Sequence, residues 1–554
     1  MANQLPKQFQ HPYKFDKKYT KSVAYFSMEF AIDQSLKIYS GGLGFLAGSH
    51  MRSAYDLKQN VIGIGVLWSK GYYDQYRKED LSMGVLFQNK IYHFLQDTNI
   101  RFQIKIHGHD VWVAAYFLNP ETFGTVPMFF LSTDLPENDY LARSTTSKLY
   151  DSDPTAKVAQ QMVLGLGGAK LLDELDYEPE LYHYNEAHAL SSAFHLYKKF
   201  GSVEKVRERV VFTTHTPEEA GNEKHEIEWL HRLSFFNGLS LEETRKITGV
   251  DGVILDHTLV GMRFSHKANG VSKLHGEVSR DMWKNHKGIC PITHITNAQN
   301  KKYWADTVLE QARVSKDREG LIKRKARLKQ KLFQEVADQT GKLFDPNVLT
   351  IVWARRFAEY KRPDLIARDM ERFLALINNA DCPVQVIFAG KPYPMDYNAV
   401  HVFDNLIHIS KTVKNVAVLV GHELRLSRKL KEGADIWLNN PRVTREASGT
   451  SGMTAAMNGA INFSTNDGWV REFKDMNKKQ NSFVLPIVDH ELPKFTQDQI
   501  DLDNMYDMLN NEILPLYYKT PKKWWDLVET SMTQVAEFFD ADRMADEYYE
   551  KMYK

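Results

Sequence analysis

Short apolar runs of strand length alternate along the chain with longer segments in which apolar residues recur at helical spacing. Several runs are almost continuously apolar, which is typical of strands buried on both faces of a parallel sheet. The clearest runs are Val23–Phe30, Val61–Trp68, Arg209–Thr213, Val348–Ala354, Val384–Ala389, Val416–Gly421, Asp435–Leu438 and Ala460–Phe463. Strands and helices in alternation predict a doubly wound α/β fold.

Helical spacing is clearest in two segments between these runs. One apolar face consists of Leu43, Leu46, Ala47, Met51, Ala54 and Leu57, and the other of Ile366, Met370, Phe373, Leu374 and Ile377. Before the second face, Pro363 stands where a first helical turn accepts a proline. The span from Trp304 to Thr340 is long, helical and basic, and we interpret it as a solvated helix that connects two domains.

We expect three regions along the chain. Residues 1–300 form an N-terminal α/β domain, residues 301–520 a C-terminal α/β domain, and residues 521–554 a helical segment that packs back across both. Two α/β domains that face a cleft would place ligands at the carboxyl ends of their parallel strands. Functional motifs are therefore expected in loops that directly follow strands.

Composition narrows the class of protein. A chain of 554 residues suits roughly two to four domains. The 71 Lys plus Arg against 70 Asp plus Glu give a formal net charge of +1, which argues against nucleic acid or an anionic membrane as a partner. Two cysteines, Cys290 and Cys382, fit a reducing compartment. No signal peptide or membrane span is recognisable, and we expect a cytoplasmic protein.

The segment Ser40-Gly41-Gly42-Leu43-Gly44 opens the first predicted helix. Glycines let a backbone approach a ligand closely, and a helix N-terminus favours negative charge. Taken alone, this loop fits a tight turn as well as a ligand-binding loop. Two other segments are interpreted structurally: Gly165–Lys170 as close helix packing, and the pair His107 and His109 as a hairpin turn, so that no metal site is predicted.

Polar groups also follow two further apolar segments. Asn185 and His188 belong to an Asn-Glu-Ala-His segment, and His215 belongs to a Thr-Thr-His-Thr-Pro segment about 30 residues later. A single histidine is more often a structural residue than a catalyst. Two such segments near the ends of apolar runs favour a shared cleft.

The C-terminal half carries two more clusters. Four cations lie in the nine residues from Ala354 to Arg362, directly after an apolar strand, where they could bind a dianion such as phosphate. A charged surface loop is the alternative interpretation. The segment from Glu446 to Gly459 is rich in small hydroxyls and glycines, and backbone amides there can hold sugar or phosphate oxygens.

Together these motifs resemble the α-glucan (glycogen and starch) phosphorylase family, in particular its short bacterial branch. The resemblance is nearly collinear from about Val23 to Phe473, and its motifs are YSGGLGFLAGSH, HYNEAHA, FTTHTPEEAGNE, NGVSKLHGEVSRDMW, ARRFAEYKR, IFAGKPYP and EASGTSGM. It implies a GT-B architecture, in which two Rossmann-like domains face a central cleft. It also implies a glycosyltransferase whose partners are an α-glucan and phosphate or glucose 1-phosphate, and it leaves a homo-oligomer open.

The resemblance implies a role for each matching residue. His215, Arg356 and Lys361 are implied as catalytic, the histidine through its backbone carbonyl and the two cations as the grip on substrate phosphate. Contacts to sugar or phosphate are implied for Gly41, Gly42, Leu43, Asn185, His188, Asn297, Glu446, Ser448 and Gly449. Thr450 and Ser451 lie where the family binds the phosphate of its cofactor, pyridoxal phosphate.

Two positions depart from the family. A lysine of the family holds pyridoxal phosphate as a Schiff base, and that position is Thr454 here, which has no amine. No covalent Schiff base is therefore expected at Thr454, although the cofactor can bind without the tether, and Lys391 or Lys474 is an alternative partner. After Asn297, the usual Gly-Val-His is replaced by Ala-Gln-Asn.

The leading hypothesis is a retaining α-1,4-glucan phosphorylase-like glucosyltransferase that moves glucose between an α-glucan and phosphate. Thr454 motivates two alternatives: a nucleotide-sugar-dependent retaining glucosyltransferase of GT-B fold, and a catalytically weakened glucan-binding homologue. The retained Arg356, Lys361 and Glu446 argue against a protein that only binds glucan, because such a protein has little need to grip phosphate.

Overall fold

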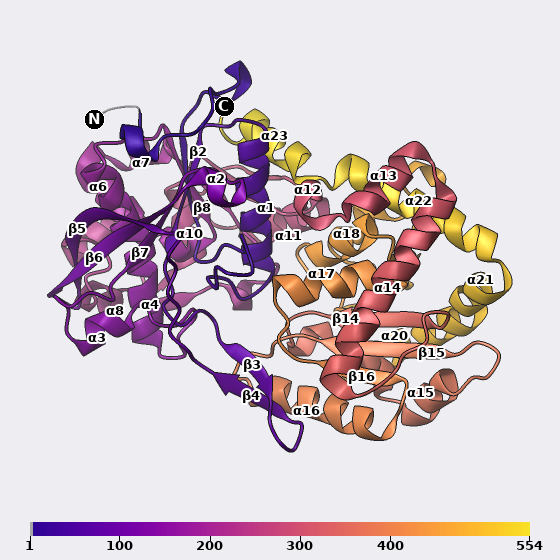
Figure 1. Cartoon of the computed structure of the whole chain (residues 1–554). Coiled ribbons are helices and arrows are strands. Elements are labelled where there is room, and N and C mark those ends of the chain that lie inside the picture. The colour runs from indigo at the N-terminus through magenta and orange to yellow at the C-terminus, as the bar shows by residue number, and fades with distance from the viewer. Residues whose placement is uncertain (1–3) are drawn as a thin grey trace. The chain divides into compact units, whose positions relative to one another are not determined.

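The computed structural model describes residues 4–554, which form two compact units (Figure 1). Unit 1 consists of residues 4–73, Phe87–Asn297 and Ala541–Lys554, and unit 2 consists of Asp74–Leu86 and Ala298–Asp540. Among these described residues, no helix is both long and apolar enough to cross a membrane. The domain ranges expected from the sequence stay a prediction.

Unit 1 is built on a large, mainly parallel sheet. In spatial order its strands are β13 (Ile292–His294), β12 (Lys267–Gly270), β9 (Val210–Thr213), β8 (Leu181–Asn185), β1 (Val23–Phe26), β2 (Val61–Val66), β7 (Met128–Ser132), β6 (His109–Leu118) and β5 (Gln96–Ile106). Neighbouring strands from β13 to β7 are parallel. Numbered along the chain, they read 3-2-1-4-5-6-7 from β7 to β13, which is the doubly wound order. The order reverses between β1 and β8.

The helices of unit 1 lie between its strands along the chain, except the last, which follows them all. They are α1 (Gly42–Asp56), α2 (Pro120–Phe123), α3 (Tyr140–Ser144), α4 (Pro154–Met162), the π-helical turn η3 (Val163–Gly167), α5 (Gly168–Glu174), α6 (Ser191–Phe200), α7 (Val203–Arg207), α8 (Ile227–Arg232), α9 (Leu241–Thr248), α10 (His257–Arg263), α11 (Lys273–Trp283) and α23 (Ala541–Lys551). A small antiparallel pair, β10 (Lys224–Glu226) and β11 (Ile254–Asp256), precedes α8 and α10. The first helix, α1, packs against α23 at the end of the chain (Figure 1).

Unit 2 contains a second doubly wound sheet, which is parallel throughout. In spatial order its strands are β16 (Val416–Leu419), β15 (Val384–Ala389), β14 (Leu349–Ala354), β17 (Ile436–Asn439), β18 (Ile461–Ser464) and β19 (Phe483–Val484). Along the chain this order reads 3-2-1-4-5-6, and it reverses between β14 and β17. The antiparallel hairpin of β3 (Asp74–Arg77) and β4 (Met83–Leu86) also belongs to unit 2.

Helices cover both faces of the sheet in unit 2. They are α12 (Lys301–Trp304), α13 (Thr307–Ser315), α14 (Arg318–Thr340), α15 (Met370–Ile377), α16 (Tyr397–Thr412), α17 (Leu424–Gly433), α18 (Thr450–Met457), α19 (Val470–Phe473), α20 (Lys494–Met508), α21 (Leu514–Lys519) and α22 (Pro521–Phe538). Alternate residues of β14 join two different buried clusters, with Trp353 in one and Val352 in the other. Phe373 of α15 and Phe403 of α16 belong to the first cluster, whereas Leu332 of α14 belongs to the second.

The predicted α/β alternation is confirmed. The apolar runs in both halves form β1, β2, β9, β14, β15, β16, β17 and β18, although β1 already ends at Phe26 and β2 at Val66. The first predicted helix is α1. Close packing at Gly165–Lys170 is confirmed, because a Cβ on Gly165 would come within 2.2 Å of the Ser191 hydroxyl. His107 and His109 stand at the β5–β6 hairpin turn, as expected.

Two helix predictions are wrong. No α-helix begins at Pro363; the chain makes short 3-10 turns first, and α15 begins only at Met370, where the Asp369 side chain caps it by accepting from the N–H of Arg372. The segment from Trp304 to Thr340 is not one solvated connector. It breaks at Lys316, and α14 lies within unit 2 with a buried apolar face.

Candidate functional site

Three charged side chains meet in unit 2, where β14 and β17 end. Arg355 directly follows β14, and Glu446 lies in the loop between β17 and α18. The Nη2 atom of Arg355 is 2.8 Å from Oε2 of Glu446, and Nζ of Lys361 is 3.4 Å from the same oxygen. No more than 11% of any of these side chains is exposed. This is the point where the strand order reverses, which is where open α/β sheets usually bind ligands.

Burial and charge set the protonation of this cluster. Burial raises the pKa of Glu446, but Arg355 and Lys361 together outweigh it and bring the pKa to about 2, so the carboxylate is ionised. Burial and repulsion from Arg355 lower the pKa of Lys361 to about 7, although Glu446 favours its charged form. Lys361 can therefore gain or lose a proton near neutral pH.

The loop that contains Glu446 is fixed by hydrogen bonds to the Asp467 side chain. The Asp467 carboxylate accepts hydrogen bonds from the backbone N–H groups of Glu446 and Gly468, each at 2.9 Å. Gly468 has φ +61, and a Cβ there would come within 2.4 Å of the Ser448 carbonyl oxygen, so only glycine fits. Burial, together with the charge of Glu446, raises the pKa of Asp467 to about 7. Asp467 thus positions Glu446 through the backbone.

Three buried donors beside this loop have no hydrogen-bond partner among the residues that the structure describes. They are Nη1 of Arg355, the hydroxyl of Ser448 and Nε1 of Trp469. Trp469 lies next to Glu446 across Gly449, because a Cβ built on Gly449 would be 3.2 Å from the Trp469 ring and 3.5 Å from Cγ of Glu446. Buried polar groups are rarely left unpaired, so the arrangement favours a ligand rich in oxygen atoms.

The pKa of Lys361 leads to a prediction about anion binding. Sulfate keeps a constant charge across the neutral range, so its affinity reports the charge of the protein. We expect the affinity for sulfate to fall above pH 7, by up to about tenfold per pH unit, as Lys361 loses its proton. Calorimetric titration between pH 6 and 9 measures this. In Lys361→Arg the side chain stays protonated, and the profile should be flat; identical profiles in both proteins would contradict the assignment.

In unit 1, the residue that organises the glycine loop is Glu29, which follows β1. Its carboxylate accepts from the backbone N–H of Ser40 at 2.6 Å, from that of Gly41 at 3.1 Å, and from the hydroxyl of Tyr150 at 2.7 Å. A Cβ on Gly41 or Gly42 would meet no atom within 4 Å, so packing does not require glycine at either position. The open space at the start of α1 suits the close approach of a ligand.

The carboxyl end of β8 carries a strained turn that positions His215. Glu186 has φ +68, a conformation that costs a non-glycine residue free energy and persists mainly where function requires it. Its carboxylate accepts from the backbone N–H of His215 and from the Thr216 hydroxyl. The Nε2–H of His215 donates to Oδ1 of Asn185 at 2.7 Å, and Nδ2 of Asn185 donates to the Ser27 hydroxyl at 3.0 Å.

Burial keeps the histidines of this region neutral. It lowers the pKa of His215 to about 3 and that of His188 to about 4. Within residues 4–554, Nδ1 of His188 and Oδ1 of Asn297 are buried without a hydrogen-bond partner. The backbone N–H of Asn297 donates to the Val271 carbonyl at 2.9 Å. Both side-chain atoms are buried polar groups that a ligand of unit 1 could pair.

The first turn of α18 holds the residues expected to contact the cofactor. Gly449 caps the helix with φ +92, which favours glycine, and Thr450 and Ser451 follow it. Thr454 is only 1% exposed, and its hydroxyl donates to the Ser451 carbonyl at 3.0 Å. The Thr454 side chain is thus bonded within its own helix.

Comparisons with known proteins identify relatives of this chain. The family model for carbohydrate phosphorylases matches residues 305–514. An uncharacterized protein of Methanocaldococcus jannaschii is 44% identical over 96% of this chain and 100% of that relative. A maltodextrin phosphorylase of Thermococcus litoralis is 32% identical over 97% of this chain and 71% of that relative. The chain belongs to the carbohydrate phosphorylase family. A glycogen phosphorylase of Aquifex aeolicus is 29% identical over 98% of this chain and 87% of that relative.

The residues predicted from the sequence are divided between the two units. The unit 2 group consists of Lys361, Glu446, Ser448, Gly449, Thr450, Ser451 and Thr454, which lie in the loop before α18 or on that helix, apart from Lys361, which contacts the loop through Glu446. The unit 1 group consists of Gly41, Gly42, Leu43, Asn185, His188, His215 and Asn297. Arg356 is exposed and forms a hydrogen bond with Tyr360. The roles of all these residues stay predictions.

Sequence reasoning missed five residues that organise the candidate site: Glu29, Tyr150, Glu186, Arg355 and Asp467. Glu186 and Arg355 lie inside motifs, and their charge next to an apolar strand was a signal that could have singled them out. The other three lie outside any motif. They act through backbone amides or through contacts distant in sequence, which leave no local pattern.

Proposed function

We propose that this protein transfers a glucosyl unit between an α-1,4-glucan and phosphate, with retention of configuration at the glucose C1 atom. The observation that carries the proposal is the buried cluster of Arg355, Glu446 and Lys361 beside donors without protein partners. Cations suit a phosphate dianion, whereas an ionised carboxylate accepts hydrogen bonds from sugar hydroxyls. The relatives named maltodextrin phosphorylase and glycogen phosphorylase support both substrates.

In the proposed reaction one bond to C1 forms, another bond to C1 breaks and one proton is transferred. A phosphate oxygen bonds to C1 on the face that the glucan leaves, while the bond from C1 to the glucan oxygen breaks. The proton on the phosphate passes to that glucan oxygen, which leaves as a hydroxyl. Arg356 and Lys361 hold the phosphate, and its negative charge stabilises the positive charge that develops at C1.

We propose further that the two units form a GT-B arrangement with the predicted residues along one cleft. Each unit has a switch point of strand order, and each switch point has predicted residues at the carboxyl ends of its strands, which supports this. Unit 1 would then contribute Gly41, Gly42 and Leu43 on the phosphate side. The His215 carbonyl would face C1, and His188 and Asn297 would face sugar hydroxyls.

Pyridoxal phosphate is the cofactor that the family implies, but the threonine at position 454 does not fit covalent attachment of this cofactor. Thr454 has no amine, and its hydroxyl is already bonded to the Ser451 carbonyl. Of the two alternative lysines, Lys391 donates to Glu423 at 2.8 Å and is only 7% exposed, and Lys474 is an exposed residue after α19. The proposed reaction therefore uses no step on the cofactor ring.

Replacing Thr454 tests this disagreement directly. We expect Thr454→Lys to acquire a covalent label after incubation with pyridoxal phosphate and reduction with borohydride, because a lysine amine can form the imine. The wild type and Thr454→Arg, which adds a cation without an imine-forming amine, should stay unlabelled at this helix. Peptide mass spectrometry reads out the label. A wild-type protein labelled at Lys391 or Lys474 would show instead that the tether has moved.

Donor choice separates the proposal from its competitor. A nucleotide-sugar-dependent transferase is the second candidate, because Thr454 is a short side chain where the family's tether would lie. Purified protein is assayed with maltodextrin and glucose 1-phosphate, ADP-glucose or UDP-glucose. Turnover of glucose 1-phosphate alone supports the phosphorylase. Turnover of a nucleotide sugar alone supports the second candidate, and glucan binding without any turnover identifies a weakened homologue.

A further inference from the structure

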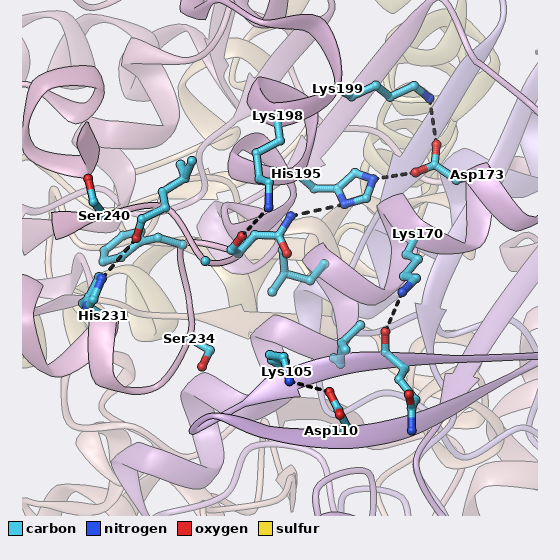
Figure 2. Close-up of a pocket in the computed structure, with 17 residues that line it drawn as sticks. Lys105, Asp110, Lys170, Asp173, His195, Lys198, Lys199, His231, Ser234 and Ser240 are labelled. Carbon is cyan, nitrogen blue, oxygen red and sulfur yellow. Dashed lines mark hydrogen bonds and ion pairs between the residues drawn. The ribbon is translucent and has the colours of Figure 1, made fainter. Parts of the chain in front are cut away.

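Unit 1 contains a cavity of about 950 Å³ that shares no residue with the candidate site (Figure 2). It lies among β5, β6, η3, α5, α6 and the loop between α8 and α9. Figure 2 shows its labelled lysines coming from three elements around one opening: Lys105 from β5, Lys170 from α5, and Lys198 and Lys199 from α6. A volume of this size is in the range of small-molecule sites.

The acidic side chains that line the cavity are already used by two of its lysines. Lys105 lies 2.8 Å from Asp110. Lys199 lies 2.8 Å from Asp173 and 3.3 Å from Glu178. Asp173 also bonds Nε2 of His195 at 2.6 Å. Among the lining residues, Asp110 and Asp173 are therefore occupied by groups other than Lys170 and Lys198.

The two remaining lysines carry positive charge that no carboxylate of the lining balances. Nζ of Lys170 donates to the Gln103 carbonyl at 2.8 Å, and Nζ of Lys198 donates to the Asn237 carbonyl at 3.1 Å. Each ammonium group has three donors, so these single bonds to neutral oxygens hold the side chains in place and leave N–H groups for a ligand. The carbonyl bonds also reduce the entropy that binding would cost.

Part of the lining is apolar. Ile104, Leu166, Phe236 and Leu239 are all buried residues, and Phe236 packs edge-on against Phe194 of α6. A phosphate ion alone would fill a small part of the cavity. An organic body attached to the phosphate would contact these apolar side chains as well.

We propose that this cavity binds a small organic molecule that carries a phosphate group. Two uncompensated ammonium groups from two helices match the two charges of a phosphate monoester near neutral pH. A carboxylate, with one charge, would match them less well. The site is separate from the phosphate grip proposed in unit 2, since the two lie in different units of the chain.

Calorimetric titration of the full chain tests the proposal with phenyl phosphate, inorganic phosphate and phenol as probes. The Lys361→Ala background weakens the proposed phosphate grip of unit 2 by removing one of its two cations. We expect phenyl phosphate to bind this protein, inorganic phosphate to bind more weakly and phenol not to bind. Adding Lys170→Gln and Lys198→Gln should weaken phenyl phosphate at least about tenfold, because two charge-assisted hydrogen bonds are lost.

Matched variants keep the result interpretable. Lys205→Gln with Lys246→Gln removes the same charge from exposed positions of α7 and α9 and should leave the affinity unchanged. Lys170→Arg with Lys198→Arg keeps the charge and should retain most of the binding, even if the glutamine variant folds poorly. The proposal is overturned if phenyl phosphate fails to bind, if its binding disappears already in Lys361→Ala, or if phenol binds equally well.

Discussion

Replacing Lys361 with alanine should lower kcat/KM for inorganic phosphate in glucan phosphorolysis by about 10²–10³-fold. The ammonium group lies 3.4 Å from Glu446 in a buried cluster, where a fixed charge stabilises the transition state far more than an exposed charge would. Arg355 keeps its own bond to Glu446 at 2.8 Å, so the carboxylate remains held in the variant. Initial rates at varied phosphate concentration measure the loss.

The control for this experiment is a lysine of unit 2 with the same charge and no buried partner. Lys494 pairs with Glu359 at 3.0 Å, but 64% of its side chain is exposed. Lys494→Ala should therefore change kcat/KM less than about twofold, since exposed pairs contribute little. Unchanged phosphorolysis in Lys361→Ala would remove this residue from the proposed phosphate grip.

Strands β14, β15, β16, β17 and β18 of unit 2 could be predicted from the sequence because both faces of their sheet are buried, whereas no run was recognised at β19. Neighbouring residues of β14, such as Val352 and Trp353, enter different buried clusters, so the strand appears as one apolar run.

The start of α15 was misjudged for a local reason. Pro363 is acceptable in a first helical turn, but Asp369 offers the stronger N-cap, so the helix runs from Met370 to Ile377.

The candidate site was predictable as segments of the chain but not as pairs of residues. Arg355 and Arg356 are neighbours after β14, and nothing in the motif tells them apart. Only the contact with Glu446, 91 residues further along the chain, shows that Arg355 is the buried partner. Asp467 was invisible for a different reason, because it acts on the backbone N–H of Glu446, a group that every non-proline residue carries.

The strand order of each sheet adds a physical reason for where these segments meet. A doubly wound sheet reverses its order once, and the two strands at the reversal send their following loops to opposite sides, which opens a crevice at their carboxyl ends. In unit 2 the reversal of strand order lies between β14 and β17, and in unit 1 between β1 and β8. Arg355 and Glu446 follow the first pair, and Glu29 and Glu186 follow the second.

Arg362→Ala should lower the free energy of unfolding by about 3–5 kcal/mol. The Arg362 side chain is 0% exposed and lies 3.0 Å from Asp498 and 2.7 Å from Asp501. It also donates to the carbonyls of Asn440 and Pro441, which lead from β17 to the loop of Glu446. Removing the guanidinium leaves Asp501, itself 2% exposed, without this cation and leaves both carbonyls without this donor.

The pH dependence and a matched arginine identify the cause of that loss. Burial raises the pKa of Asp501 even with Arg362 present, so without Arg362 the folded state should hold the Asp501 proton to a higher pH than the unfolded chain does. The deficit of Arg362→Ala should therefore grow as pH rises from about 4 towards 7. Arg372, whose side chain is 35% exposed in its pairs with Asp369 and Asp503, should cost at most about 1 kcal/mol when replaced by alanine. Urea unfolding followed by tryptophan fluorescence compares the two variants, and equal losses would mean that the buried carboxylates do not depend on Arg362.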